Sequence, residues 1–237
     1  MKFNSLLIKG RLIKRYKRFL ADVELESGET VTAHCANSGS MLSINVPGAE
    51  VWLSPAKNPE RKLKYTWELI RIGRSLVGAN TSHPNDLVAE AITARKIPEL
   101  MGYSSQSREV KYGKNSRVDI LLEDTELGRC YVEVKNVTMR RHFGRHDPVE
   151  FPDGVTARGA KHLVELSDMV AEGHRAVMFY LVQRGDCSAG VTIARDIDPK
   201  YGYALDKARN AGVEVIAYGC KLNLNEIKIT KSLVFLN

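Results

Sequence analysis

The stretch RVDILLEDTELGRCYVEVK, residues 117 to 135, contains two apolar runs that each carry charge where a buried strand is expected. Asp119 interrupts the first run, and Glu133 and Lys135 alternate with valines in the second. Because side chains two residues apart share one face of a strand, Glu133 and Lys135 are expected on the same face. The intervening Glu126-Leu127-Gly128 is typical of a tight turn. The stretch therefore predicts a hairpin that brings Asp119 beside Glu133.

Two neighbouring carboxylates repel each other, and a charge buried in a sheet is costly unless it is paired or binds a metal. We therefore expect Asp119 and Glu133 to hold a divalent cation, Mg²⁺ or Mn²⁺, through their hard oxygen ligands. Such a cation stabilises charge on a phosphate, and the Lys135 ammonium can orient or help to deprotonate the attacking water. The pattern thus indicates a phosphodiesterase-type site. A purely structural ion pair is the alternative.

Residues before and after this stretch have the pattern of an α/β domain with a mixed sheet, over residues 84–237. The apolar periodicity predicts strands at 107–112, 117–123, 130–137, 175–183 and 213–218, and helices at 86–97, 157–172 and 200–211. Asn85 or Asp86 is expected to cap the first helix. Glu90 lies at the edge of that helix's apolar stripe, where it can reach the metal through water or remain an ordinary surface glutamate.

The segment that follows Lys135 is rich in basic residues and can hold a nucleic acid over the metal. Its loop contains Arg140, Arg141 and Arg145, and Thr156 can cap the next helix. Arg158 and Lys161 in the first turns of that helix would favour a phosphate. The apolar pattern predicts that Ala160, Leu163, Val164, Ser167, Val170 and Ala171 face the core, with Arg158, His162 and Glu165 opposite. The alternative is that these polar residues form a solvated helix face.

Residues 1–83 have the pattern of a small antiparallel β-barrel. Predicted strands cover 3–16, 19–26, 30–36, 41–53 and 64–73, and turn formers at 78–84 indicate the boundary. The first 83 residues hold 13 basic against 7 acidic side chains, which is most of the chain's net charge of +7. Nucleic-acid contact is therefore predicted here, or alternatively a solvated face; its candidate residues are Lys14, Arg15, Lys17 and Arg18. Aromatic residues among them either stack on bases or, as for Phe19 and Trp67, form the barrel core.

Composition excludes several other classes of protein. Apolar residues make up 43% of the 237 residues, which is ordinary for a globular chain. No apolar run reaches the roughly 18 residues that span a bilayer, and the N-terminus lacks a signal-peptide pattern, so we expect a cytoplasmic protein without a membrane partner. Four widely spaced cysteines, Cys35, Cys130, Cys187 and Cys220, are expected to be reduced and buried.

The order of elements around Asp119, Glu133 and Lys135 resembles that of the PD-(D/E)xK nuclease-like fold, although Arg117-Val118 replaces the leading proline. Further motifs resemble the sugar fermentation stimulation protein A family: HCANSGSM at 34–41, VGANT at 77–81, VEVKNVT at 132–138 and FPDGVT at 151–156. The resemblance implies an OB-like N-terminal barrel, a nuclease-like second domain, DNA binding with little sequence preference and a link to sugar metabolism. The resemblance to the PD-(D/E)xK nuclease-like fold also implies that Gln183, at the end of a predicted strand, lies near the site. His34, Asn37, Ser38 and Asn80 lie in these motifs and are expected to face the cleft between domains, although turn chemistry explains Asn37-Ser38 equally well.

Two functional hypotheses follow. The chain either binds DNA and cleaves it at a Mg²⁺-dependent site, or it is a catalytically silent DNA-binding regulator. The residues leave open DNA against RNA, single against double strands, and a monomer against a homodimer.

Overall fold

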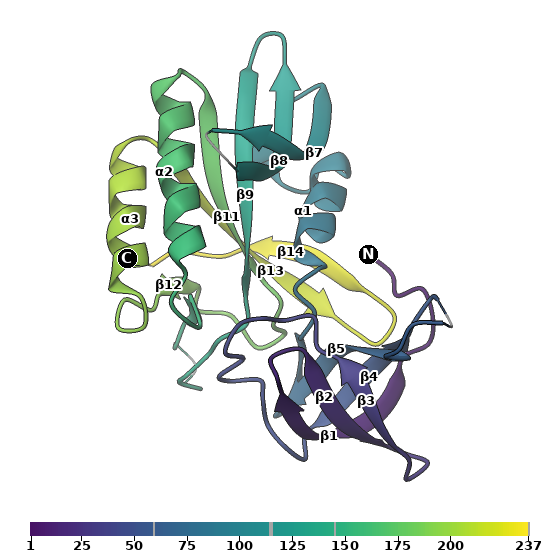
Figure 1. Cartoon of the computed structure of the whole chain (residues 1–237). Coiled ribbons are helices and arrows are strands. Elements are labelled where there is room, and N and C mark those ends of the chain that lie inside the picture. Colours follow the sequence, from purple (N-terminus) through teal and green to yellow (C-terminus); the bar gives the residue numbers. More distant parts are fainter. Residues whose placement is uncertain (59, 114–115, 145, 237) are drawn as a thin grey trace.

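The computed structural model describes residues 1–58, 60–113, 116–144 and 146–236. It contains two six-stranded sheets, one in each half of the chain, and a two-stranded ladder beside the second sheet (Figure 1). The mixed fold, with an OB-like barrel before an α/β domain, is the one predicted from the sequence.

The N-terminal sheet closes into a barrel because β3 pairs with both β2 and β5. Its strand order is β3-β2-β1-β4-β5-β6, and the strands are β1 (Ile8–Tyr16), β2 (Leu20–Leu25), β3 (Thr30–His34), β4 (Glu50–Pro55), β5 (Tyr65–Ile72) and β6 (Ser75–Gly78). Trp67 is fully buried in the barrel core, whereas Phe19 is 47% exposed. The strand predicted at 41–53 begins only at Glu50, since the chain turns through Pro47-Gly48 with a φ of 81° at Gly48.

The second sheet has the order β14-β13-β11-β9-β8-β7, in which β9, β11 and β13 are parallel and the outer pairs are antiparallel. Its strands are β7 (Ser105–Tyr112), β8 (Ser116–Asp124), β9 (Gly128–Val137), β11 (Arg175–Val182), β13 (Glu214–Leu222) and β14 (Ile227–Ser232). Short strands β10 (Val149–Phe151) and β12 (Val191–Ile193) pair beside it. The sequence pattern did not indicate β6, β10, β12 or β14, because three of them have only three or four residues and β14 has only two apolar residues among six.

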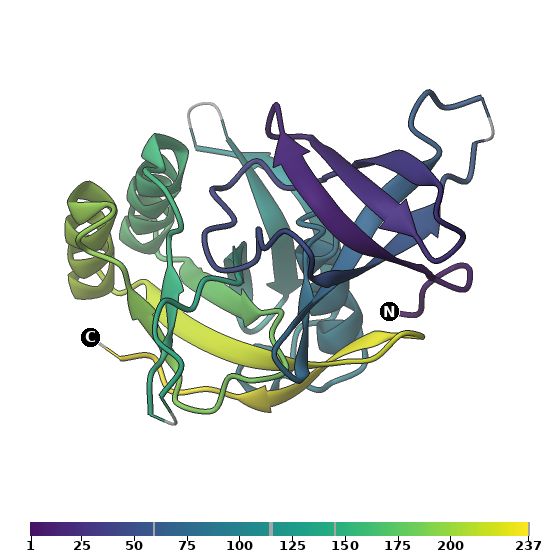
Figure 2. The ribbon, with the colours of Figure 1, turned by 90° about the horizontal axis from the view of Figure 1, so that it is seen from below.

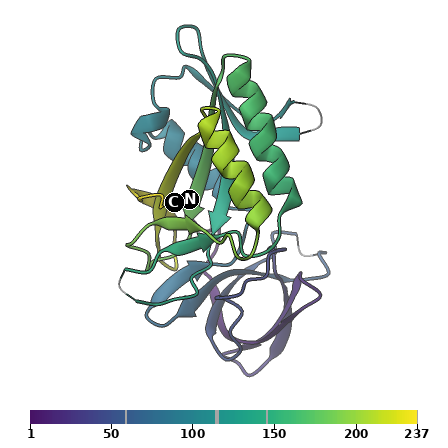
Figure 3. The same cartoon turned by 90° about the vertical axis from the view of Figure 1, so that its left-hand side faces the viewer.

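Helices cover both faces of this sheet (Figure 3). Helix α1 (Pro84–Thr93), followed by the short 3₁₀ helix η1 (Pro98–Leu100), lies on one face, and α2 (Ala157–Ala171) and α3 (Pro199–Asn210) lie on the other. Helix α1 begins earlier than predicted, with His83 at the N-cap, because the φ of Pro84 suits the first helical position. Thr156 caps α2 as expected, accepting a hydrogen bond from the Gly159 N–H at 3.0 Å.

The face of α2 that contacts the sheet differs from the prediction. His162 and Glu165 are each 4% exposed, whereas Val164 is 58% exposed. Leu163 and Leu166 complete the buried stripe. An apolar pattern alone cannot locate this stripe, because the sheet beneath α2 presents Glu133, which bonds His162.

The four cysteines are free and buried, as predicted. Within the described ranges, no helix combines the length and hydropathy needed to cross a bilayer. The segment between β3 and β4 reaches from the barrel toward the α/β half (Figure 2). There the Met41 N–H donates to Asp153, and Ser43 donates to the Thr138 carbonyl.

Candidate functional site

The carboxylate pair lies where β8 separates from β9. The two strands pair from Asp124↔Gly128 to Ile120↔Val132, and the same register carried one residue further sets Asp119 opposite Glu133. Beyond this point β9 continues beside β11, so the backbone of β9 needs a new partner on its other edge. Asp119 supplies it: its Oδ2 accepts the Val134 N–H at 2.7 Å. Its Oδ1 accepts a hydrogen bond from Asn85 Nδ2 at 2.7 Å, which ties the site to the start of α1.

Glu133 is almost completely buried and has two cationic or potentially cationic neighbours. Lys135 Nζ lies 2.6 Å from Glu133 Oε1, and His162 Nδ1 bonds the same oxygen. Arg158 Nε donates to His162 Nε2 at 3.3 Å, which leaves the ring proton of a neutral His162 on Nδ1, facing Glu133. The second oxygen, Glu133 Oε2, is buried without a hydrogen-bond partner among the described residues.

The two carboxyl groups titrate in opposite directions. Burial, together with the charge of Glu133, raises the pKa of Asp119 to about 6, although the Val134 N–H, Lys135 and Asn85 oppose the shift. Burial also disfavours ionised Glu133, but its bonds to His162 and Lys135 outweigh that effect and hold its pKa below the ordinary value. The protein therefore stabilises the ionised form of Glu133, whereas Asp119 has too little positive charge around it to stabilise its ionised form.

Further buried polar groups surround the pair. Glu165 and the Tyr112 hydroxyl are buried without hydrogen-bond partners among the described residues, although Lys161 Nζ lies 3.5 Å from one Glu165 oxygen. Burial raises the pKa of Tyr112, and the negative charges of Glu133, Glu165 and Asp119 raise it further. An excess of buried negative charge is the condition under which a protein binds a cation.

The donor set fits a hard divalent cation held by few protein ligands. In the described part of the chain, no three His, Cys, Asp or Glu side chains are grouped as metal ligands. Mg²⁺, however, is commonly held by one or two carboxylates, with water and substrate oxygens completing its coordination. Asp119 and Glu133, with its unpartnered Oε2, are suited to that role.

Glu90 does not belong to this cluster. It is 58% exposed and pairs with the Met1 ammonium at 2.8 Å. Asn85 and Glu90 are five residues apart on α1, which at 100° per residue sets them about 140° apart around the helix axis. Asn85, which the sequence suggested only as a helix cap, is the α1 residue that reaches Asp119.

The arginines of the loop after β9, Arg140 and Arg141, have hydrogen-bond and ion-pair partners within the protein. Arg140 is 6% exposed and donates to the carbonyls of His142, Gly144 and Asp186. Arg141 pairs with Glu150 and Asp196. Their guanidinium groups therefore hold the loop itself, and contact of these two side chains with nucleic acid stays a prediction. Arg145 lies outside the described residues.

The basic N-terminal residues divide into two groups. Lys14 is exposed, 3.7 Å from Asp22, and lies over the Tyr16 ring. Arg15 donates to the carbonyls of Asn37 and Gly39 at 2.8 and 2.9 Å, so it fixes the loop after β3. Lys17 and Arg18 are exposed in the turn between β1 and β2, both with positive φ.

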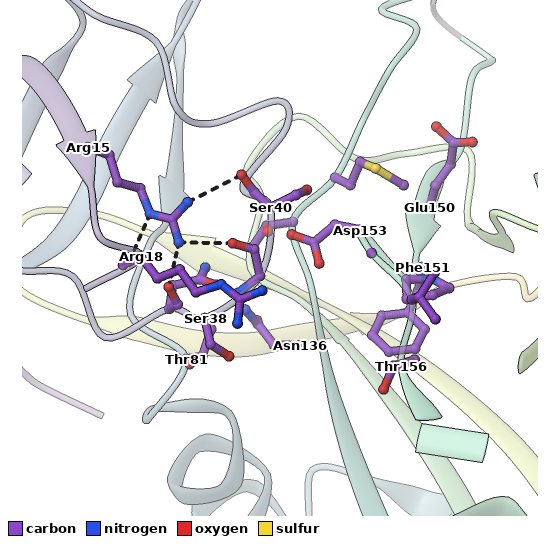
Figure 4. A pocket seen from close by; sticks show the side chains of 17 residues that line it. Arg15, Arg18, Ser38, Ser40, Thr81, Asn136, Glu150, Phe151, Asp153 and Thr156 are labelled. Carbon is purple, nitrogen blue, oxygen red and sulfur yellow. Dashed lines mark hydrogen bonds between the residues drawn. The ribbon is translucent and has the colours of Figure 1, made fainter. Parts of the chain in front are cut away.

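Two clefts adjoin α2. A basic cleft of about 910 Å³ is lined by Arg158, Lys161 and His162 of α2 and by residues of the β7–β8 hairpin, Lys111, Tyr112 and Arg117 among them. An interdomain cleft of about 720 Å³ lies between the barrel and the α/β half (Figure 4). Its barrel wall includes Arg15, Arg18 and Asn37 to Ser40, and its other wall includes Asn136 and Phe151 to Thr156.

The remaining candidates lie at or near the interdomain junction. Asn37 and Ser38 line the interdomain cleft, as expected. Gln183 is fully buried and donates to Asn136 Oδ1 at 2.8 Å, one residue beyond Lys135. Asn80 is also buried, where it donates to Glu68, and His34 belongs to β3 without lining the cleft.

The sequence reasoning missed Asn85, Tyr112 and Glu165 as neighbours of the carboxylates, and it set His162 on the wrong helix face. A spacing signal exists for one pair only: His162 and Glu165 are three apart and so share a helix face. Asn85 and Tyr112 come from other elements and carry no local signal.

Known proteins match the whole chain. Two family models match, the sugar fermentation stimulation protein RE domain over residues 82–226 and the SfsA N-terminal OB domain over residues 13–79. Curated proteins named sugar fermentation stimulation protein homolog are similar: that of Rhodospirillum rubrum is 58% identical over 94% of each chain, and that of Azorhizobium caulinodans is 53% identical over the full length of both. The solved structure of Pyrococcus furiosus SfsA in complex with Ca²⁺ has the same fold, with a TM-score of 0.88 and 24% identity over 100% of this chain and 98% of that one.

Proposed function

The chain belongs to the sugar fermentation stimulation protein family, and we propose that it binds nucleic acid and hydrolyses phosphodiester bonds at Asp119, Glu133 and Lys135 with a divalent cation. The observation that carries this proposal is the pair of carboxylates beside Lys135, buried Glu133 and half-buried Asp119, at the point where β8 and β9 separate. DNA is the proposed substrate. The free, buried cysteines are consistent with a cytoplasmic location.

The residues of the site divide the chemical work. A bound cation supplies Lewis acidity that stabilises negative charge on the phosphate. Asp119 and Glu133 would hold it, and Asn85 and the Val134 N–H fix the orientation of Asp119. The Lys135 ammonium places positive charge beside Glu133, where it can stabilise the developing charge of the transition state and orient water.

The choice of cation rests on its preferred ligands. The related Pyrococcus furiosus SfsA was solved in complex with Ca²⁺. Ca²⁺ and Mg²⁺ both take oxygen ligands, but Mg²⁺ needs fewer from the protein. With two carboxylates available, we propose Mg²⁺ or Mn²⁺ as the catalytic ion.

A second function, that of a catalytically silent DNA-binding regulator of sugar metabolism, is favoured by one observation. Lys135 already balances the charge of Glu133 within the protein, and His162 bonds the same carboxylate oxygen. A site of this kind can persist without a metal and without turnover.

Cleavage assays separate the two functions. The protein is incubated with labelled single- and double-stranded DNA and RNA in Mg²⁺, Mn²⁺ or EDTA, beside Asp119→Asn and Lys135→Met. Arg74→Ala, in an exposed barrel turn, is the matched control. We expect metal-dependent cleavage that both site variants lose by at least 100-fold and the control retains. Cleavage that survives both substitutions, or its absence from the unaltered protein under every condition, would refute the phosphodiesterase proposal.

A further inference from the structure

The two clefts adjoin α2 on either side of its first turns. The interdomain cleft ends at Thr156, the N-cap of α2, and the basic cleft begins with Arg158 and includes His162. His162 bonds Glu133, and Asn136 in the interdomain cleft directly follows Lys135. Each cleft is therefore lined by a residue adjacent to the carboxylate pair, although neither lining includes Asp119, Glu133 or Lys135.

The basic cleft has the charge expected of a phosphate-binding surface. Among its described lining residues are four basic side chains, Lys111, Arg117, Arg158 and Lys161, and one acidic side chain, Glu109. Phosphate contacts of this kind supply affinity without sequence preference.

The interdomain cleft is walled on both sides and bridged at the back. The Met41 N–H donates to Asp153 Oδ2 at 2.9 Å, and Ser43 donates to the Thr138 carbonyl at 3.2 Å. A Cβ on Gly39 would lie 2.6 Å from Asp153 Oδ2, so the two halves approach here as closely as glycine allows. The cleft, about 720 Å³, has the size of a small-molecule pocket.

Among the described residues that line this cleft, Arg18 is a cationic side chain without a partner, and Val155 is an exposed apolar side chain. Arg15 is occupied by the loop carbonyls, and Glu150 by Arg141. Arg18 reaches into the cleft toward Asn136 and Ser38 (Figure 4). On the opposite wall Val155 is 77% exposed and can contact a base.

We infer that a single strand of nucleic acid, not a duplex, lies along the first turns of α2. Its phosphates on one side of the cleaved bond occupy the basic cleft, and its nucleotides on the other side occupy the interdomain cleft, where Arg18 contacts a phosphate. This inference rests on the proposed function for the position of the cleaved bond. The size of the interdomain cleft decides against a duplex, because a pocket of about 720 Å³ admits the nucleotides of one strand but not a double helix.

Binding is measured without cleavage. Fluorescence anisotropy in EDTA and in Ca²⁺ compares a 12-nucleotide single-stranded DNA with the blunt duplex of the same sequence. We expect the single strand to bind at least tenfold more tightly. Arg18→Gly, which suits the positive φ of Arg18, should weaken single-strand binding about tenfold and reduce the slope of log K against log salt by about 0.7. Arg18→Lys should recover most of the affinity.

Arg74→Gly is the matched control, since it removes the same charge from another exposed turn of the barrel. Equal affinity for duplex and single strand, or equal effects of Arg18→Gly and Arg74→Gly, overturns the inference. A single-strand preference that depends on Arg18 in a protein that cleaves nothing in Mg²⁺ would instead refute the phosphodiesterase proposal and leave this one standing. Cleavage of duplex substrates by a protein without single-strand preference would refute this inference and leave the phosphodiesterase proposal standing.

Discussion

Replacement of Asp119 by asparagine should stabilise the metal-free protein at neutral pH. Asp119 has an ordinary pKa of 3.8, and burial beside Glu133 raises it to about 6 in the folded protein. A folded-state pKa that is raised means that folding disfavours the ionised group, so stability falls as pH rises from about 4 to about 6. About two pKa units at about 1.4 kcal/mol each give an unfavourable contribution of about 3 kcal/mol at pH 7.

The substituted asparagine would remove this penalty but lose part of the hydrogen bonding. Asp119 accepts from both Asn85 and the Val134 N–H, and an amide can accept from only one of them through its single oxygen. The lost hydrogen bond costs about 1 kcal/mol. We therefore expect Asp119→Asn to raise the free energy of unfolding by about 2 kcal/mol at pH 7, and to lower it by about 1 kcal/mol near pH 4, where the penalty vanishes.

Urea unfolding in EDTA between pH 4 and pH 8 measures this difference. Asp124→Asn, at the other end of β8, is the control, because hydrogen bonds from the Glu126 and Leu127 N–H groups lower the pKa of Asp124. It should destabilise at pH 7, with an effect that shrinks toward pH 4. Saturating Ca²⁺ should stabilise the unaltered protein and not Asp119→Asn. A difference that stays constant from pH 4 to pH 8, or an Asp119→Asn protein less stable at pH 8, would refute the reasoning.

Three further predictions concern the second partner of Glu133 and the barrel. His162→Ala should weaken Ca²⁺ binding 10- to 100-fold in calorimetry, because Glu133 loses the group that orients it. Val164→Ala, on the exposed face of the same helix, should leave Ca²⁺ affinity unchanged. Equal losses of affinity in the two variants would argue against an orienting role for His162. Trp67→Ala should lower the free energy of unfolding by about 3 to 5 kcal/mol, since the ring is fully buried; a loss below about 1 kcal/mol would contradict the barrel core. Burial disfavours ionised Glu68, but bonds to His83, Ser54 and Asn80 hold its pKa below the ordinary value. Glu68→Gln should therefore destabilise the folded protein at pH 7, and progressively less as pH falls below about 4. A loss of stability that does not shrink at low pH would exclude the Glu68 charge as its source.

Local sequence determined the elements that carry the site. Alternation of apolar and charged residues at 117–135 was sufficient to predict the hairpin and the opposition of Asp119 and Glu133, because register follows from the two-residue period and the turn. The start of α2 at Thr156 was predicted for a similar reason, since a cap acts on residues three positions away. Strands β2, β3 and β5 followed from the same period, whereas β1 and β4 begin later than predicted and β6 was not predicted.

Only the tertiary structure decided what surrounds these elements. His162 is buried because the sheet beneath α2 presents Glu133 as its hydrogen-bond partner, which no pattern within the helix can reveal. Asn85 rather than Glu90 reaches Asp119, since the rotation of α1 is set by its packing on the sheet. Arg140 and Arg141 hold their own loop although their sequence context resembles that of phosphate-binding arginines. Charge and periodicity are properties of the chain, but the partner of a charged side chain depends on segments far away in sequence.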